Sequence, residues 1–238
     1  MFLSILREAA SFYNWHLKEE QYEQFDRYCR LLLAANEKMN LTAITAPEEV
    51  AIKHMADSLT VYDENIFNNS TNIIDIGTGA GFPGIPIKIY RNDLPLTLLD
   101  AQEKRVKFLR EVVEELGLKG AECIHGRAED LAREEKYRER FQIAVSRAVA
   151  ALPVLAEYAL PFVKVGGCFL AMKGLRGKEE AKEGAKAIKT LGGYIDTIRE
   201  VKLFNLEDKR FIIKITKEKE TPKKYPRKAG LPNKKPIV

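Results

Sequence analysis

The residues best suited to chemistry lie together in residues 73–84, where an apolar run ends at an acid and glycines follow. Asp75 closes the apolar run, and Gly77, Gly79 and Gly81 recur at alternate positions after it. Glycine has no side chain to keep a ligand off the backbone, and it tolerates positive φ. An aspartate just before such a turn can accept a hydrogen bond from an amino or hydroxyl group. The stretch therefore predicts a site for a nucleotide-like ligand.

Two classes of nucleotide site share this pattern. Residues 79–84 match the GxGxxG fingerprint of dinucleotide sites, and Asp100 closes the next apolar run, where a ribose-binding acid belongs. The longer pattern, acid-x-Gly-x-Gly-x-Gly with a second acid further on, is more typical of the S-adenosylmethionine site of Rossmann-like methyltransferases. Asp75 would repel a pyrophosphate, whereas a zwitterionic amino acid end tolerates it. The pattern favours S-adenosylmethionine over NAD.

Alternating strand and helix patterns must position these residues. The expected strands are 71–76, 96–100, 122–125, 141–146 and 167–173, and the expected helices are 84–91, 103–116, 129–136, 152–159 and 178–190. Two further β-rich segments, 193–203 and 210–216, read as a closing antiparallel hairpin. The expected fold class is α/β, a Rossmann-like class I methyltransferase sheet that is mainly parallel and doubly wound.

Helical patterns precede this sheet. Residues 20–39 place apolar side chains at helical spacing, and Pro47 opens a second helix. We therefore expect an N-terminal helical extension at 1–65 and a methyltransferase domain at 66–220. The remaining residues, 221–238, form a basic C-terminal tail.

The net charge of +5 is distributed unevenly along the 238 residues. Residues 1–65 hold six basic and eleven acidic residues, whereas residues 221–238 hold six basic and none acidic. Because this tail also contains Pro and Gly, its composition suits an extended arm on phosphates rather than a packed element. A merely solubilising terminus would have a similar composition.

The sequence lacks the residues that several classes of protein function require. The three cysteines have no metal-ligand spacing, and neither a metal cluster nor a GKS or GKT phosphate loop is present. No apolar run is long enough for a membrane span or an export signal. We expect a cytoplasmic protein without metal, and nothing requires more than a monomer.

In a doubly wound sheet the ligand lies at the carboxyl ends of the strands. Asp100 is the expected partner of the ribose hydroxyls, with a helix N-cap as the alternative. Glu129 is expected near the adenine amino group, or as first-turn helix charge. Phe82 is expected as a wall of the cofactor site, or as a core aromatic.

Cations also lie at these strand ends. Arg147 and Lys173 each end an apolar strand, and Arg127 follows the third strand, so we expect all three to contact substrate or cofactor. His54 and Asp57 precede the sheet without a framed nucleophile. Hydrogen bonding that docks the N-terminal helices is therefore their expected role.

The missing groups narrow the chemistry. The region after the fourth strand holds neither the Asn-Pro-Pro-Tyr pattern of exocyclic amine methylation nor the cysteine of pyrimidine carbon-five methylation. A ring nitrogen with a free lone pair, such as N7 of guanine, needs neither a base nor a nucleophile. The protein then mainly aligns the lone pair, the methyl group and the sulfur.

The sequence resembles the glucose-inhibited division protein B family over nearly its whole length. The resemblance is carried by Asp-Ile-Gly-Thr-Gly-Ala-Gly-Phe-Pro-Gly-Ile-Pro at 75–86, Ser-Arg-Ala at 146–148, Met-Lys-Gly at 172–174 and Lys-Tyr-Pro-Arg-Lys at 224–228. Asn-Leu-Thr at 40–42, followed by His54 and Asp57-Ser58, is similar to its N-terminal segment.

The resemblance implies a bacterial cytoplasmic enzyme that uses S-adenosylmethionine to methylate N7 of one guanine in 16S ribosomal RNA, near the decoding region. The implied substrate is this RNA, or the small ribosomal subunit. The family's cofactor contacts fall on Gly77, Phe82, Ala128, Glu129 and Arg147. A methyltransferase acting on another RNA or a small molecule, an NAD-dependent oxidoreductase and a non-catalytic RNA-binding module remain as alternatives.

Overall fold

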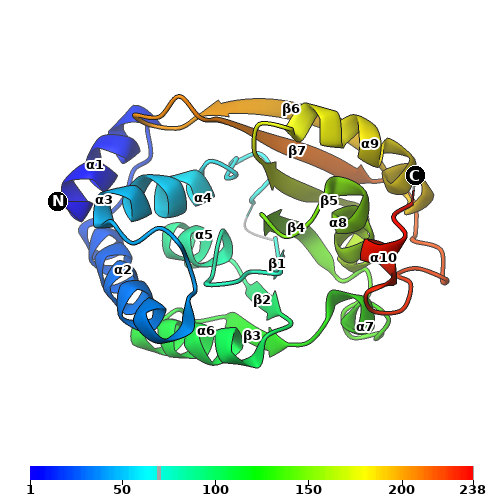
Figure 1. The fold of residues 1–238 in the computed structure, drawn as a ribbon, viewed down its shortest axis with the longest axis horizontal. Helices are drawn as coiled ribbons and strands as arrows, with labels where there is room; N and C mark the ends of the chain where they lie inside the picture. The colour runs from blue at the N-terminus through cyan, green and yellow to red at the C-terminus, as the bar shows by residue number, and fades with distance from the viewer. Residues whose placement is uncertain (69–70, 238) are drawn as a thin grey trace.

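In the computed structural model, which describes residues 1–68 and 71–237, one seven-stranded sheet runs through the molecule (Figure 1). Val238, the end of the expected tail, lies outside the described residues. The strand order is β3-β2-β1-β4-β5-β7-β6. The pairs formed among β1 to β5 are all parallel. Strand β7 is antiparallel to both of its neighbours, β5 and β6.

The strands occur where the sequence predicts them. They are β1 (Ile73–Ile76), β2 (Leu96–Asp100), β3 (Ala121–His125), β4 (Phe141–Arg147), β5 (Val163–Lys173), β6 (Gly193–Lys202) and β7 (Lys209–Lys217). The helices among them are α5 (Gly84–Tyr90), α6 (Glu103–Glu115), α7 (Ala128–Leu131), α8 (Leu152–Ala159), a 3₁₀ turn (Leu160–Phe162) and α9 (Gly177–Thr190). The expected α/β sheet and its closing hairpin are confirmed.

Both faces of the central strands are buried, as their apolar sequences require, whereas the edge strands β3 and β6 are largely exposed or half-buried. Along β4, Ile143 and Val145 pack into one hydrophobic cluster and Ala144 into another, because successive side chains of a strand point to opposite faces. The first cluster includes α5 and α6, and the second includes α8 and α9. Helices on both faces are what a parallel sheet needs.

The N-terminal helices extend the first of these clusters. Helix α1 (Phe2–Phe12) was not singled out by the sequence, while α2 (Glu19–Met39) follows the predicted amphipathic pattern. The side chains of Phe25, Tyr28 and Leu32 are wholly buried in the cluster that covers the sheet. The helical extension therefore shares its core with the sheet.

The helix opened by Pro47 changes its geometry part-way. It runs as α3 (Pro47–Val50), a π-helical segment (Ala51–Ala56) and α4 (Asp57–Leu59). A π-helical turn adds a residue to the turn and re-aims the side chains on it, often at a functional site. This segment carries His54 and leads into Asp57.

The helix expected over residues 129–136 is shorter than predicted, because α7 ends at Leu131. Beyond it the Arg138 guanidinium donates hydrogen bonds to the carbonyl oxygens of Ala132 (3.2 Å) and Tyr225 (2.9 Å). This segment is therefore tied to the C-terminal residues. Helical periodicity in residues 129–136 could not report that long-range partner.

The basic tail is packed against the sheet domain rather than extended. The Arg227 guanidinium binds both carboxylate oxygens of Glu157, whose side chain is wholly buried on α8. Further on, α10 (Leu231–Lys234) follows Gly230. A buried carboxylate requires a cationic partner, and the tail supplies it. The other tail cations remain exposed.

Candidate functional site

The glycine loop after β1 has the backbone that its sequence predicts. Gly77, Gly79 and Gly81 have φ values of 67°, 63° and 109°. A Cβ atom on Gly81 would lie 2.6 Å from the Tyr28 hydroxyl oxygen, so no larger residue fits there. That hydroxyl donates a hydrogen bond of 2.6 Å to the carbonyl of Ala80. Helix α2 thereby holds the loop in place.

Asp75 lies beneath this loop. Its Oδ2 accepts hydrogen bonds from the Thr78 hydroxyl (2.6 Å) and the Gly84 amide (2.8 Å). Complete burial raises the pKa of Asp75 to about 7. The side chain lines neither of the two cavities described below, so Asp75 shapes the loop rather than facing a ligand directly.

Asp100 joins the loop to the end of β2. Its Oδ2 accepts a hydrogen bond from the Gly79 amide (2.9 Å), and its Oδ1 accepts one from the Gln102 amide (2.8 Å). Gln102, and not Asp100, is the N-cap residue of α6, and no side chain caps this helix, so the N-cap alternative for Asp100 is not realised. Asp100 also lines a cavity of about 140 Å³ at the carboxyl edge of the sheet.

This smaller cavity brings together four of the nine residues that are expected to bind the cofactor. They are Gly77, Asp100, Ala128 and Glu129, and Arg127 lies with them in the lining. They come from three strand ends that are distant in sequence, as the topology of a doubly wound sheet requires. A nucleoside portion fits the mixed apolar and acidic lining.

Glu129 has a partner that the sequence did not reveal. Its side chain is buried, and its Oε1 accepts a hydrogen bond of 2.8 Å from the backbone amide of Gly230 in the tail. The tail therefore contacts Glu129, one of the residues that line the smaller cavity. Gly230 adopts φ 80°, a conformation that favours glycine.

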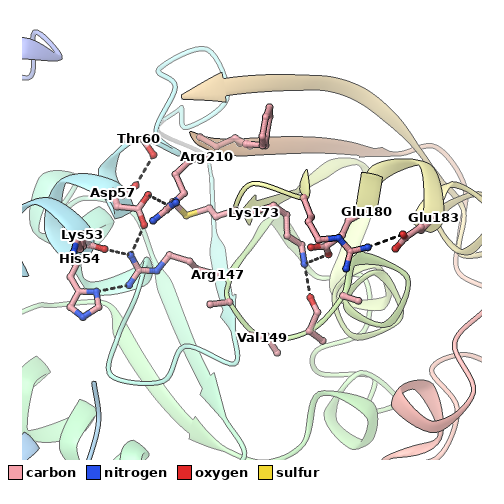
Figure 2. Close-up of a pocket in the computed structure, with 18 residues that line it drawn as sticks. Lys53, His54, Asp57, Thr60, Arg147, Val149, Lys173, Glu180, Glu183 and Arg210 are labelled. Carbon is pink, nitrogen blue, oxygen red and sulfur yellow. Dashed lines mark hydrogen bonds and ion pairs between the residues drawn. The ribbon is translucent and has the colours of Figure 1, made fainter. Parts of the chain in front are cut away.

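A larger cavity of about 670 Å³ lies at the ends of β4, β5 and β7 (Figure 2). Its lining holds His54 and the charged residues Lys53, Asp57, Arg147, Lys173, Arg176, Glu180, Glu183 and Arg210. The cavity holds both signs of charge in close proximity. A polar, planar ligand with donors and acceptors on its edges suits such a wall.

Arg147 binds the N-terminal helices, as Figure 2 shows. Its guanidinium donates to Asp57 Oδ2 (2.8 Å), to the carbonyl of Lys53 (3.0 Å) and to Nδ1 of His54 (3.1 Å). The expected docking role of His54 and Asp57 agrees with these contacts. Burial and the neighbouring Arg147 lower the pKa of His54 to about 3, so its ring is neutral.

Phe82 packs against His54 and Arg147. Its ring stacks on His54 with centroids 4.5 Å apart, and the Arg147 guanidinium lies 4.9 Å from its centre. The ring lines neither cavity, so the core alternative describes it better than a cofactor wall.

Lys173 is held at the opposite wall of the larger cavity. Its ammonium lies 2.8 Å from Glu180 Oε2 on α9 and donates to the carbonyl of Ala150 (Figure 2). The side chain is 6% exposed. Its position beside the expected substrate site agrees with the sequence, but its charge is already paired.

Val149 separates the two cavities and lines both. A Cβ atom on Gly77 would lie 2.7 Å from Val149 Cγ2, so the segment after β4 rests on the glycine loop. Ala148 takes a left-handed φ of 56° to place it there. A cofactor in one cavity and a substrate in the other would therefore meet at this residue.

Sequence reasoning missed Arg210 as a site residue. It stands at the start of β7, where Lys173 of β5 pairs with Phe211. Because β7 is antiparallel, its beginning lies at the carboxyl edge of the parallel strands. The predicted hairpin contained this signal, since a final antiparallel strand must start where its neighbour ends.

Comparison with known proteins decides the family. Residues 21–207 match the GidB family, described as rRNA small subunit methyltransferase G. The chain belongs to this family. It is 51% identical over 234 residues to the ribosomal RNA small subunit methyltransferase G of Leuconostoc mesenteroides, covering 97% of each chain. It is 49% identical over 233 residues to that of Alkaliphilus metalliredigens, covering 98% of each.

Solved structures share the fold at low sequence identity. A SAM-dependent methyltransferase from Aquifex aeolicus superimposes with a TM-score of 0.55 at 15% identity, over 77% of this chain and 97% of the other. P. horikoshii TYW2 in complex with MeSAdo gives 0.54 at 13% identity, over 68% and 61%. The class I methyltransferase fold is confirmed. Family membership confirms the expected methyltransferase, and with it S-adenosylmethionine as the cofactor.

Within residues 1–68 and 71–237, no group of three or more His, Cys, Asp or Glu side chains could hold a metal ion. None of the helices in the same residues has the length and apolar character needed to cross a bilayer.

Proposed function

We propose that this protein transfers the methyl group of S-adenosylmethionine to N7 of one guanine in 16S ribosomal RNA, near the decoding region. The supporting observation is the meeting of two cavities at Val149, one lined by the glycine loop and acids and the other by paired charges. The family and its rRNA methyltransferase relatives support the substrate class. The exact base and position come from the resemblance.

The smaller cavity would hold the nucleoside of the cofactor. We expect Asp100 to accept hydrogen bonds from the ribose hydroxyls. We expect Glu129 to accept one from the adenine amino group, because Gly230 occupies only its Oε1. Gly77 lies where the two cavities meet, beside the methionine half. When bound, S-adenosylmethionine supplies a methyl group on a positively charged sulfur.

The larger cavity would align the guanine. The N7 lone pair forms the new bond to the methyl carbon while the carbon–sulfur bond breaks, and its electron pair stays on sulfur. N7 carries no proton, so no general base is required. This agrees with the state of His54, which is neutral and engaged by Arg147 and by the Thr42 hydroxyl (2.8 Å). Positioning therefore supplies most of the rate enhancement.

The RNA must present its base to this cavity. A base inside a helix has to leave its stack before an enzyme can modify it. Arg127 is exposed beside the smaller cavity, and the tail displays lysines on the same side of the domain. These cations would bind phosphates and hold the RNA while the base enters. We propose that the protein acts in the cytoplasm as a monomer.

The test is product analysis. The protein is incubated with methyl-labelled S-adenosylmethionine and small-subunit RNA, or intact small subunits, from cells that lack its gene. The RNA is then digested and the labelled nucleoside identified. Labelled 7-methylguanosine supports the proposal. Another labelled nucleoside, or no label when cofactor binding is confirmed by calorimetry, would overturn it, and the latter would favour a non-catalytic RNA-binding module.

A further inference from the structure

One carboxylate oxygen at the wall of the larger cavity accepts no hydrogen bond, although a cation lies near it. Asp57 is 4% exposed, and its Oδ2 accepts a hydrogen bond of 2.8 Å from Arg147. Its Oδ1 is buried and lacks a hydrogen bond among the described residues. Arg210 Nε lies 4.0 Å from Oδ1, too far for a hydrogen bond.

A buried acceptor without a hydrogen bond lowers the stability of the folded state, so its position is evidence about what the cavity binds. Leaving such an atom without a donor costs about 1–3 kcal/mol, and more for a charged group. Native proteins satisfy nearly all buried polar atoms, so an exception at a cavity wall indicates a donor from a ligand. Asp57 lines the cavity and lies between Arg147 and Arg210 in Figure 2.

The geometry around Asp57 restricts what that donor can be. Arg147 fixes Oδ2, so a single carboxylate oxygen is available. The cavity has the volume of a site for a small, flat molecule. The neighbouring cations would attract acceptor atoms, whereas Oδ1 can only accept. The occupant must therefore present a donor at one place on its ring and acceptors at another.

Guanine has this pattern. Its 2-amino group is a donor that no other standard RNA base carries, and its O6 and N7 atoms are acceptors. The 2-amino group lies at the far end of the purine from N7, so a contact there leaves N7 free. Adenine would instead present no donor at position 2.

We propose that Asp57 selects guanine by accepting a hydrogen bond from its 2-amino group through Oδ1. This inference rests on the proposed function, because it concerns the base that the larger cavity receives. Asp57 then has two roles, since Oδ2 positions Arg147 while Oδ1 binds the substrate. Replacing Asp57 with a smaller residue would disturb both roles, so a loss of activity alone does not test the contact with guanine.

The decisive readout is a ratio of rates on two RNAs. Small-subunit RNA is assembled by ligation with either guanosine or inosine at the methylated position. Inosine lacks only the 2-amino group and keeps N7. For the wild-type protein, kcat/KM should be about 10-fold to 100-fold higher for guanosine, because a hydrogen bond to a charged acceptor is lost.

Variants identify the acceptor. Asp57→Ala should bring the guanosine-to-inosine ratio close to one, whatever its overall activity. His54→Gln is the matched control, because it also removes a partner of Arg147 but leaves Asp57 in place. It should lower activity and preserve the ratio. Asp57→Asn, which keeps a neutral acceptor, should give an intermediate ratio and is available if Asp57→Ala does not fold.

The outcomes separate the two claims. Equal wild-type rates on guanosine and inosine, with 7-methylated products from both, would overturn the role of Asp57 and leave the proposed function intact. A ratio retained in Asp57→Ala would do the same. Absence of 7-methylguanosine from the guanosine RNA would instead overturn the proposed function.

Discussion

At the scale of single residues, the charged groups of the site are held mainly by one another. Arg147 is fixed by Asp57 and His54, and Lys173 by Glu180. These two cations at the strand ends do line the larger cavity, as the sequence predicted, but each is already paired with an acidic side chain. Such pairing keeps the cavity wall rigid, which favours alignment over electrostatic attraction as the source of rate.

Asp75 gives a prediction at this scale. Because burial raises its pKa to about 7, the folded state keeps a proton that the unfolded state loses at lower pH. The contribution of this group to stability therefore falls as the pH rises from about 4 to 7. Asp75→Asn, which cannot ionise, should remove that fall and be more stable at pH 7.5 by up to about 4 kcal/mol.

Urea unfolding of both proteins from pH 4.5 to 7.5 measures this difference. The two curves should converge toward low pH, where Asp75 is protonated in both states. Parallel curves over the whole range would contradict a buried carboxyl with a raised pKa.

At the scale of elements, the tail supports one wall of the smaller cavity through Glu129. Arg227 anchors it on the buried Glu157, and three residues later the Gly230 amide binds Glu129. The tail is thus a brace on the acid expected to recognise adenine. The charge of the tail and its packing have separate roles, because Arg227 is half-buried and ion-paired with Glu157 while Lys228 is exposed.

Arg227→Met should therefore weaken cofactor binding. Loss of the anchor frees Gly230, and one hydrogen bond of about 1.4 kcal/mol corresponds to about tenfold in affinity. Isothermal calorimetry with S-adenosylmethionine measures the change. Lys228→Met removes the same charge from the tail surface and should leave cofactor affinity unaltered. Equal affinities in the two variants would show that the tail does not support the cavity.

At the scale of the whole molecule, charge is concentrated where RNA must approach. The tail packs beside the smaller cavity, whereas the acidic N-terminal helices lie across the molecule from α10 (Figure 1). Because the tail is packed against the sheet domain, its cations lie at fixed positions on the surface. Such a surface can orient RNA relative to the cavities, which an unstructured arm could not do.

This arrangement predicts an uneven salt dependence. Replacing Lys223, Lys224 and Lys228 together with Gln should weaken binding to small-subunit RNA. It should also flatten the slope of log K against log salt by about 2, since each phosphate contact contributes about 0.7 on single strands. Replacing three of the exposed lysines of α9, Lys182, Lys186 and Lys189, removes equal charge at another place.

Filter binding at several salt concentrations measures both slopes. The α9 variant should retain most of the wild-type slope. The same loss in both variants would mean that net charge, rather than the placed tail, governs RNA binding.

The sequence by itself determined the sheet, its strand ends and the glycine loop. These follow from local patterns, because an apolar strand followed by Asp75 and alternate glycines limits the backbone to few conformations. The positions of Asp100 and Glu129 also followed, since parallel strands bring their carboxyl ends to one edge.

Only the tertiary structure decided which of these groups are free. The pairing of Arg147 with Asp57, the packing of Arg227 on Glu157 and the contact of Gly230 with Glu129 join residues that are far apart in the chain. Composition indicated an extended basic arm, because local patterns report charge but not its partner. The partner depends on which buried groups would otherwise remain unpaired, and folding determines that.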